Sequence, residues 1–242
     1  MKTEQKPFLS VIIPSRNDEA LLQGCLESLA HQETDLPWEL IVVDSSTTPA
    51  CREIAARYGA KVVHEPRRGK GLALARGAEA ARGEIFCFTE ADCRVPRHWL
   101  KAIAAEFAAD PTAVGVSGLY TFFDSTRWFN LMARIVLPLS AWAFYGMRGN
   151  HSIRGTNFAV RAQPYWVAGG VNKQAKEMQD VELGLRLAKL GKIKLVQRMC
   201  IETSDRRVRG RSAKFLRELL PAVYRLMVKK QVLTEATYED VR

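Results

Sequence analysis

Two acidic residues one position apart follow an apolar run in the first half of the chain. Glu90 and Asp92 follow residues 84–88, after the intervening Thr89. Carboxylate oxygens are the ligands that hard cations such as Mg2+ and Mn2+ take. An ion held there can bridge the phosphates of a nucleotide and neutralise a diphosphate leaving group. An acid-x-acid pattern is common, and a solvated turn capped by Asp92 is the alternative. The position of the pair at the end of an expected strand favours the metal site.

Two more residues stand where a nucleotide can be held. Asp44 ends the expected strand 39–44, where it can accept hydrogen bonds from a ribose hydroxyl or a base N–H, or satisfy the backbone of the turn that follows. Lys70, between two glycines, opens an expected helix, and a helix N-terminus favours anions. The segment lacks the Walker A spacing, so a plain loop remains open.

The second half of the chain offers a candidate base and a candidate diphosphate grip. Asp180 begins an expected helix beside Gln179. It can be an N-cap, worth about 1 kcal/mol, or a general base that removes a proton from an acceptor hydroxyl. Arg206 and Arg207 follow the last expected strand. Their planar guanidinium groups suit a diphosphate; the alternatives are a solvated basic loop and one resting on anionic lipid.

The elements that position these residues alternate regularly over the first hundred positions. Helical segments separate four short apolar runs, residues 8–14, 39–44, 61–64 and 84–88. Such alternation predicts an α/β fold with a mostly parallel sheet covered on both faces. Ligands of these sheets bind beyond the carboxyl ends of the strands. We therefore expect the polar residues after each run to share one edge.

The pattern changes after residue 110. Strands are expected at 113–123, 155–160 and 192–197, and a helix at 180–190, where alternating apolar residues leave a strand open. Residues 212–230 predict a basic amphipathic helix with a kink at Pro221. No repeat or low-complexity linker interrupts the chain, so we expect one domain in two halves.

Composition narrows the class of protein. The 242 residues carry 36 Lys and Arg against 26 Asp and Glu, a net charge of +10, with 47% apolar residues. This balance excludes collagen-like, disordered and disulfide-scaffold proteins. Five cysteines without a CxxC pair predict a reducing, cytoplasmic location. Without a nucleic-acid motif, the charge favours anionic small molecules or lipid headgroups.

No membrane-spanning segment is expected. The N-terminus lacks the apolar core of a signal peptide. The longest uncharged apolar run, residues 135–147, has 13 residues, whereas a transmembrane helix needs about 20.

Taken in order, these segments resemble the family 2 glycosyltransferases of the GT-A fold. The resemblance is carried by residues 10–19, 41–46, 69–77, 88–93, 96–100, 155–161, 169–170 and 179–186. It implies a Rossmann-like nucleotide-sugar-binding half over 1–110, a smaller mixed acceptor and catalytic half over 111–211, and a C-terminal basic helix over 212–242. An ordered set of this length is far more specific than any single motif.

The resemblance also implies roles. Ser15, Glu19 and Asp44 would hold the nucleoside of a UDP- or GDP-sugar. Lys70 and Arg76 would lie near the diphosphate or the donor sugar. Further implied roles are metal binding, with Mg2+ or Mn2+, by Glu90 and Asp92, and general-base action by Asp180. The implied reaction is a hexosyl transfer that inverts the anomeric carbon, as in the synthesis of a cell-envelope polysaccharide.

The chain departs from the family at three of these positions. Glu90 replaces the usual first aspartate of the metal motif, Gln179 replaces an acid before the base, and Arg76 replaces a frequent asparagine. A degenerate member that binds a nucleotide sugar or a membrane without turnover is therefore the alternative. Nucleotidyl transfer on a similar fold would need a glycine-rich signature near the first strand, which residues 14–17 lack.

One apolar segment has two interpretations. Residues 128–147 contain tryptophan and are flanked by arginines. The segment can dip into a bilayer surface, helped by the basic residues 212–230, or it can pack on the core or at a homodimer contact. Membrane contact would imply a lipid-linked acceptor and a peripheral location at the inner face of the membrane.

Overall fold

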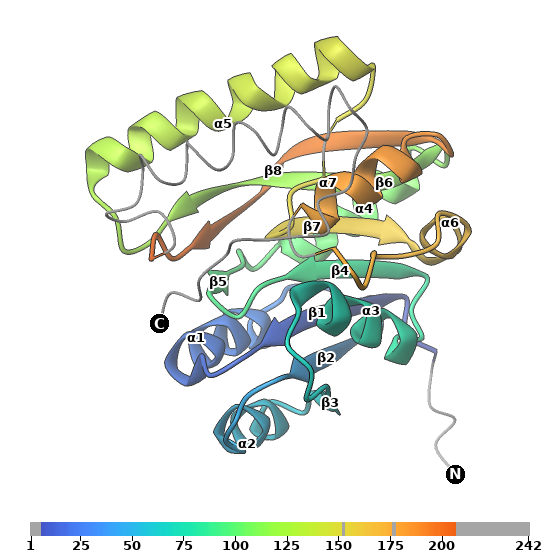
Figure 1. Ribbon diagram of the computed structural model, residues 1–242. Helices are drawn as coiled ribbons and strands as arrows, with labels where there is room; N and C mark the ends of the chain where they lie inside the picture. Colours follow the sequence, from blue (N-terminus) through green and yellow to red (C-terminus); the bar gives the residue numbers. More distant parts are fainter. Residues whose placement is uncertain (1–5, 152, 176–177, 207–242) are drawn as a thin grey trace.

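The computed structural model describes residues 6–151, 153–175 and 178–206 (Figure 1). Arg207 and the helix expected at 212–230 lie outside these residues. The described part holds a sheet that passes through both halves of the chain, with helices packed on its two faces.

The first half has the predicted alternation of strands and helices. Its elements are β1 (Leu9–Ser15), α1 (Glu19–Ala30), β2 (Trp38–Asp44), α2 (Ala50–Arg57), β3 (Lys61–His64), α3 (Lys70–Ala80), β4 (Ile85–Thr89), β5 (Cys93–Arg94) and α4 (Trp99–Ala109). Helix α2 begins directly after Pro49, and α4 begins three residues after Pro96.

The second half mixes strands of both directions. Its elements are β6 (Ala113–Phe122), α5 (Arg127–Arg148), β7 (Asn157–Arg161), α6 (Ala162–Val167), α7 (Gln179–Leu187) and β8 (Lys192–Thr203). Residues 179–187 are helical, so the strand alternative at this place is excluded. Strand β8 continues six residues beyond the predicted end, because Thr203 pairs with Phe122 of β6 and with Cys93 of β5.

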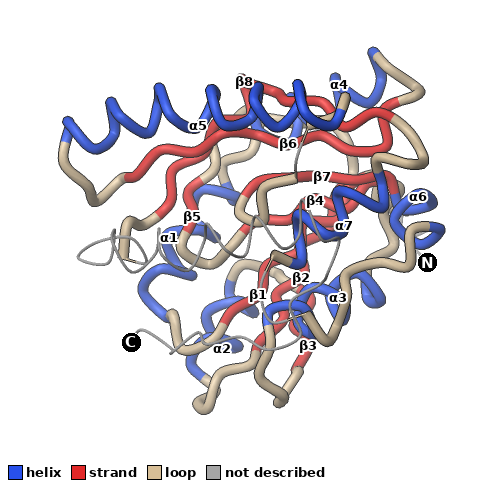
Figure 2. Tube along the Cα trace, turned by 45° about the horizontal axis from the view of Figure 1, so that its top comes forward, coloured by secondary structure: helices blue, strands red, loops and turns tan. Residues whose placement is uncertain are grey.

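The eight strands of the described residues run in the order β3-β2-β1-β4-β7-β6-β8-β5 (Figure 2). Strands β1 to β4 pair in parallel, β7 is antiparallel to both β4 and β6, and β8 is parallel to β6. The β4–β7 pair therefore joins a parallel half to a mixed half. This confirms the predicted α/β fold with a mostly parallel sheet and a smaller mixed half.

Strands β1, β2 and β4 are buried on both faces of the sheet, which explains why their sequences are short continuous apolar runs. On β1, Val11 and Ile13 point into a core shared with α1, α2 and α4, while Ile12 points into a second core shared with α3 and α7. Helix α3 lies so close to β1 that a Cβ on Gly77 would collide with Ile12. This contact holds the N-terminus of α3 at the carboxyl edge of the sheet.

Helix α5 comprises the apolar segment whose place the sequence left open. The Thr126 side chain caps its first turn by accepting a hydrogen bond from Phe129 N, and Gly149 ends it in a left-handed conformation. Pro138 lies inside the helix. None of the helices among the described residues has both the length and the apolar character needed to cross a bilayer.

Candidate active site

The carboxyl ends of β1, β2 and β4 bring the first predicted residues to one edge of the sheet. The loops after β1 and β2 are fastened together there, because Asn17 N donates to Ser46 Oγ at 2.8 Å and Asn17 Oδ1 accepts from Thr47 N at 2.9 Å. Asn17 has a positive φ of 50°. This conformation is more accessible to Asn than to most residues, and it aims both of its polar groups at the neighbouring loop.

Asp44 is the last residue of β2 and is fully buried. Its Oδ1 accepts from Ser46 N at 3.1 Å, and its Oδ2 lies 3.2 Å from Arg52 Nε. The expected turn contact is therefore present. Three buried hydroxyls at the carboxyl ends of β1, β2 and β4, those of Ser15, Ser45 and Thr89, have no hydrogen-bond partner among the described residues. Buried polar groups are normally paired, so this edge suits a ligand that brings polar atoms.

Glu65 follows β3 and is buried. Arg67 Nε and Nη2 each donate to its carboxylate at 2.8 Å, and Arg76 Nε lies 3.8 Å away. The Arg67 guanidinium outweighs burial and lowers the pKa of Glu65 to about 2. Arg76 also donates to Glu79 at 2.9 Å on the exposed side of α3. The structure thus places Arg76 with these acids rather than with the predicted metal ligands.

The predicted metal ligands Glu90 and Asp92 are both buried. Lys70 Nζ, in the first turn of α3, donates to Glu90 Oε1 at 2.6 Å. Arg206 Nη2 donates to Asp92 Oδ2 at 3.0 Å. The same guanidinium holds Asp18, through Nη1 at 2.6 Å and Nη2 at 3.0 Å. Arg206 therefore joins the loops after β1 and β4 at the expected diphosphate position.

Asp180 lies in the first turn of α7, whose N-cap is Met178. The interpretation of Asp180 as an N-cap is therefore wrong. Its Oδ2 instead accepts from Gly155 N at 2.6 Å. A Cβ on Gly155 would lie 3.0 Å from Asp180 Oδ2 and 3.1 Å from Lys70 Nζ. The Lys70 ammonium is thus close to both Glu90 and Asp180, and it brings the predicted base next to the predicted metal ligands.

Glu90 and Asp92 fit a divalent ion only when a bound ligand supplies further oxygen atoms. The described residues contain no group of three or more His, Cys, Asp or Glu side chains able to hold a metal ion. Glu90 and Asp92 supply two carboxylates. Mg2+ typically binds through one or two carboxylates and completes its shell with water and substrate phosphates. The residues present therefore fit a metal–diphosphate complex rather than a metal held by protein alone.

The remaining predicted residue of the described part lies at the border of the site. Glu19 is half-buried at the start of α1 and accepts from Thr48 Oγ1 at 3.5 Å. Sequence reasoning assigned no role to Asp18 or to Glu65. Glu65 directly follows β3, and Asp18 lies three residues after the end of β1. Their positions after strands pointed to the carboxyl edge of the sheet, but their partners follow only from the three-dimensional contacts.

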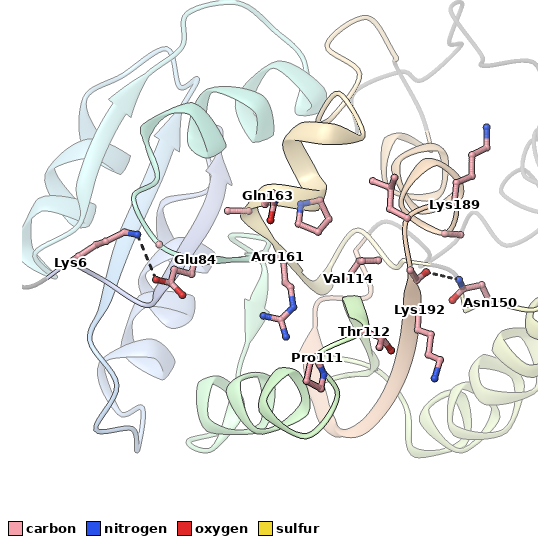
Figure 3. A pocket seen from close by; sticks show the side chains of 16 residues that line it. Lys6, Glu84, Pro111, Thr112, Val114, Asn150, Arg161, Gln163, Lys189 and Lys192 are labelled. Atoms are coloured by element: carbon pink, nitrogen blue, oxygen red, sulfur yellow. Dashed lines mark hydrogen bonds and ion pairs between the residues drawn. The ribbon is translucent and has the colours of Figure 1, made fainter.

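A cavity of about 1050 Å³ lies at the opposite edge of the sheet, before β4, β6 and β8 (Figure 3). Its central cation, Arg161, already donates to Ala113 O at 2.9 Å and Phe107 O at 2.8 Å. Lys6 pairs with Glu84 at 3.6 Å. This cavity is not part of the site formed by Glu90, Asp92 and Asp180.

Known proteins resemble the chain in sequence and in fold. An uncharacterized protein of Mycobacterium tuberculosis is 27% identical over 202 residues, covering 75% of this chain and 62% of that protein. A mannosyltransferase from Pyrobaculum calidifontis, solved with GDP-Man and Mn2+, superposes with a TM-score of 0.70 at 25% identity over 89% of this chain and 61% of that one.

A more distant structure has the same fold. The glucosyl-3-phosphoglycerate synthase of Mycobacterium tuberculosis, solved with Mn2+, UDP and glucosyl-3-phosphoglycerate, has a TM-score of 0.67 at 20% identity, over 93% of this chain and 80% of that chain. The chain spans about three fifths of the length of the first two relatives. Residues 10–169 match the model of glycosyl transferase family 2. The chain belongs to glycosyl transferase family 2, and its fold is that of the GT-A glycosyltransferases.

Proposed function

We propose that this chain transfers a hexosyl group from a nucleoside-diphosphate sugar to an acceptor hydroxyl, with inversion at the anomeric carbon. One observation carries the proposal. Lys70 donates to Glu90 and lies near Asp180, so a candidate base is close to the candidate diphosphate site. Inverting transfer needs a base and a stabilised leaving group close together.

The donor would lie along the carboxyl edge of the sheet, on the half formed by residues 1–110. Ser15, Glu19 and Asp44 would hold the nucleoside, and the unpartnered Ser15 hydroxyl supports this placement. Lys70, Arg206 and Arg207 would hold the diphosphate.

Arg76 would join this set only after leaving Glu65 and Glu79, which it contacts in this structure. The Pyrobaculum enzyme bound GDP-Man and the mycobacterial synthase UDP. Both precedents support a GDP- or UDP-sugar as the donor.

Glu90 and Asp92 would hold Mg2+ or Mn2+, as the two solved relatives with Mn2+ support. When bound, the ion supplies positive charge to the departing diphosphate. This chain's own cations, Lys70 and Arg206, contact Glu90 and Asp92 and would add to that charge. Glutamate at position 90 keeps the charge of the usual aspartate and places it one methylene further from the backbone.

Asp180 would accept the proton of the acceptor hydroxyl, on the half formed by residues 111–211. The acceptor oxygen would form a bond to the anomeric carbon while the bond from that carbon to the diphosphate breaks. The electron pair leaves with the nucleoside diphosphate. The hydrogen bond from Gly155 N fixes one oxygen of Asp180, which leaves the other to face the acceptor. We propose an acceptor that is carried on a lipid, as in envelope polysaccharide synthesis at the inner face of the membrane.

Calorimetric titration with UDP, GDP and their sugars, with and without Mn2+, tests the donor site. We expect binding of one nucleotide that depends on Mn2+ and that is lost in Asp92→Asn. The matched control is Asp110→Asn, at the end of α4, where the carboxylate holds only a local turn with Thr112. Absence of any nucleotide binding to the wild-type protein would contradict the transferase proposal.

A second variant separates transfer from binding. Asp180→Asn keeps the shape of the side chain and removes the base. We expect nucleotide binding to remain and sugar transfer, or slow hydrolysis of the donor, to fall by about 10²–10⁴-fold. Intact nucleotide binding, with no effect of Asp180→Asn on any product, would favour the alternative, a degenerate family member that binds a nucleotide sugar without turnover.

A further inference from the structure

We propose that the outward face of α5 lies on an anionic membrane surface, with the helix axis in the plane of the bilayer. This apolar face of α5 consists of Trp128, Leu131, Ile135, Val136, Leu139, Trp142 and Tyr145. Their exposed fractions range from 41% to 68%. Soluble monomers rarely expose so many large apolar side chains together, and such patches mark interaction sites.

The spacing puts these side chains on one side of the helix. Positions 128, 131, 135, 139 and 142 recur at intervals of three or four residues, which is the period of one helical face. A helix of 22 residues is about 33 Å long. The opposite side is fastened to the sheet. Asn130 donates to Phe122 O and accepts from Phe122 N of β6, both at 2.7 Å, and Ala141 is buried.

The charges around the face select the kind of partner. Residues 127–148 contain no Asp or Glu, and Arg127 and Arg134 are both exposed. Cations beside an apolar stripe suit anionic headgroups above acyl chains. At the C-terminal end of the stripe, Trp142 and Tyr145 pack against His151, with ring centroids 5.4 Å and 4.7 Å away. Amphipathic aromatic rings favour the boundary between headgroups and hydrocarbon.

A second copy of the chain fits this surface less well. Pairing two α5 helices face to face would form a contact flanked by Arg127 and Arg134 of each copy, and the helix offers no carboxylate to neutralise them. Like charges at a contact oppose association. Anionic lipid supplies the missing negative charge and buries the same apolar side chains.

The apolar face is also connected to the candidate base. Arg154 Nη2 donates to Leu137 O of α5 at 2.9 Å, and the next residue, Gly155, donates its N–H to Asp180 at 2.6 Å. Two consecutive residues thus hold the helix and the base. A helix resting on a bilayer would bring Asp180 near hydroxyl groups at that surface. The proposed membrane contact depends only on the features of α5, whereas a lipid-linked acceptor depends on the proposed sugar transfer.

Flotation with phosphatidylcholine vesicles, with and without phosphatidylglycerol, tests the contact. We expect binding to the anionic vesicles that weakens as salt is raised. Leu131→Ser with Leu139→Ser should lower vesicle binding by at least about tenfold, because both side chains would leave the hydrocarbon. The matched control is Leu36→Ser with Leu190→Ser, two exposed leucines away from α5, which should bind as the wild type does. Equal loss in both double variants would overturn the proposal.

Brominated acyl chains locate the contact independently. They should quench the tryptophan emission of the bound wild-type protein and of Trp166→Phe, and fail to quench when Trp128 and Trp142 are both replaced by phenylalanine. Quenching that survives this double replacement would overturn the assignment. A second result would also overturn it. In that case the wild type would bind no vesicles and would sediment as a dimer, and the leucine double variant would sediment as a monomer. Nucleotide titration without vesicles reports separately on the proposed function, since the leucine double variant keeps the donor site intact.

Discussion

Replacing Arg206 by glutamine removes the positive charge that joins the loops after β1 and β4. Its guanidinium donates to Asp18 at 2.6 and 3.0 Å and to Asp92 at 3.0 and 3.2 Å. These contacts bring together three residues that are up to 188 positions apart. We expect Arg206→Gln to destabilise the protein without ligand, because two carboxylates lose the cation they share.

The size of the effect follows from burial. Breaking a fully buried ion pair by removing one partner costs about 3–5 kcal/mol. The Asp92 side chain is only 2% exposed, but Arg206 is 33% exposed, and water screens that end of the pair. We therefore expect a loss of about 2 kcal/mol. For a chain of this length, the midpoint of thermal unfolding should fall by about 4–8 °C.

Thermal unfolding of two variants checks the reasoning. The control is Arg198→Gln, because Arg198 is exposed and its partner Glu106 keeps a second cation, Lys194, at 2.6 Å. The control should lose less than about 1 kcal/mol of stability. Equal losses of stability in Arg206→Gln and Arg198→Gln would refute the role of Arg206 as a cation shared by two carboxylates.

Three further changes test single contacts. Gly155→Ala should lower transfer by at least about tenfold, because its Cβ would lie 3.0 Å from Asp180 Oδ2; unchanged activity would contradict this packing. The pKa of Glu65 is lowered to about 2, so its contribution should be complete above about pH 5 and lost as pH falls toward 2. Urea titration should show Glu65→Gln less stable by about 1 kcal/mol at pH 7 and equal to the wild type near pH 2. Asn157→Ala leaves the buried Trp99 Nε1–H without its hydrogen-bond acceptor. It should lower the free energy of unfolding by about 2–3 kcal/mol in the same assay.

The parallel half of the fold could be predicted because its signals are local. Strands β1, β2 and β4 are buried on both faces, so each appears as a short continuous apolar run between turns. The edge rule for parallel sheets then placed Ser15, Asp44 and Glu90 together without any knowledge of side-chain contacts. Their convergence required only the order and direction of the strands.

The pairing of the charged groups could not be predicted in the same way. Arg206 meets Asp18 and Asp92 because β8 is longer than its apolar pattern indicates and delivers residue 206 to the loops after β1 and β4. That extension depends on the pairing of Thr203 with β6 and β5, a long-range contact that no local periodicity reports. For the same reason the contacts of Arg206 with Asp18 and Asp92 could not be predicted from the sequence.

Composition alone does not determine what the apolar residues of helix α5 contact. These residues recur at helical spacing whether they face a core, a second copy or a bilayer, so the sequence left those outcomes equal. The structure distinguishes these outcomes because it shows which side of the helix is bonded to the sheet. Asn130 and Ala141 occupy the side that faces the sheet, and Trp128 and Leu139 remain among the most exposed apolar residues of the described chain. Because burying those side chains against the described core would require turning a helix already bonded to β6, the core interpretation is excluded for them. Lipid and a second copy then differ by charge alone, and a helix with arginines and no acids favours the anionic surface.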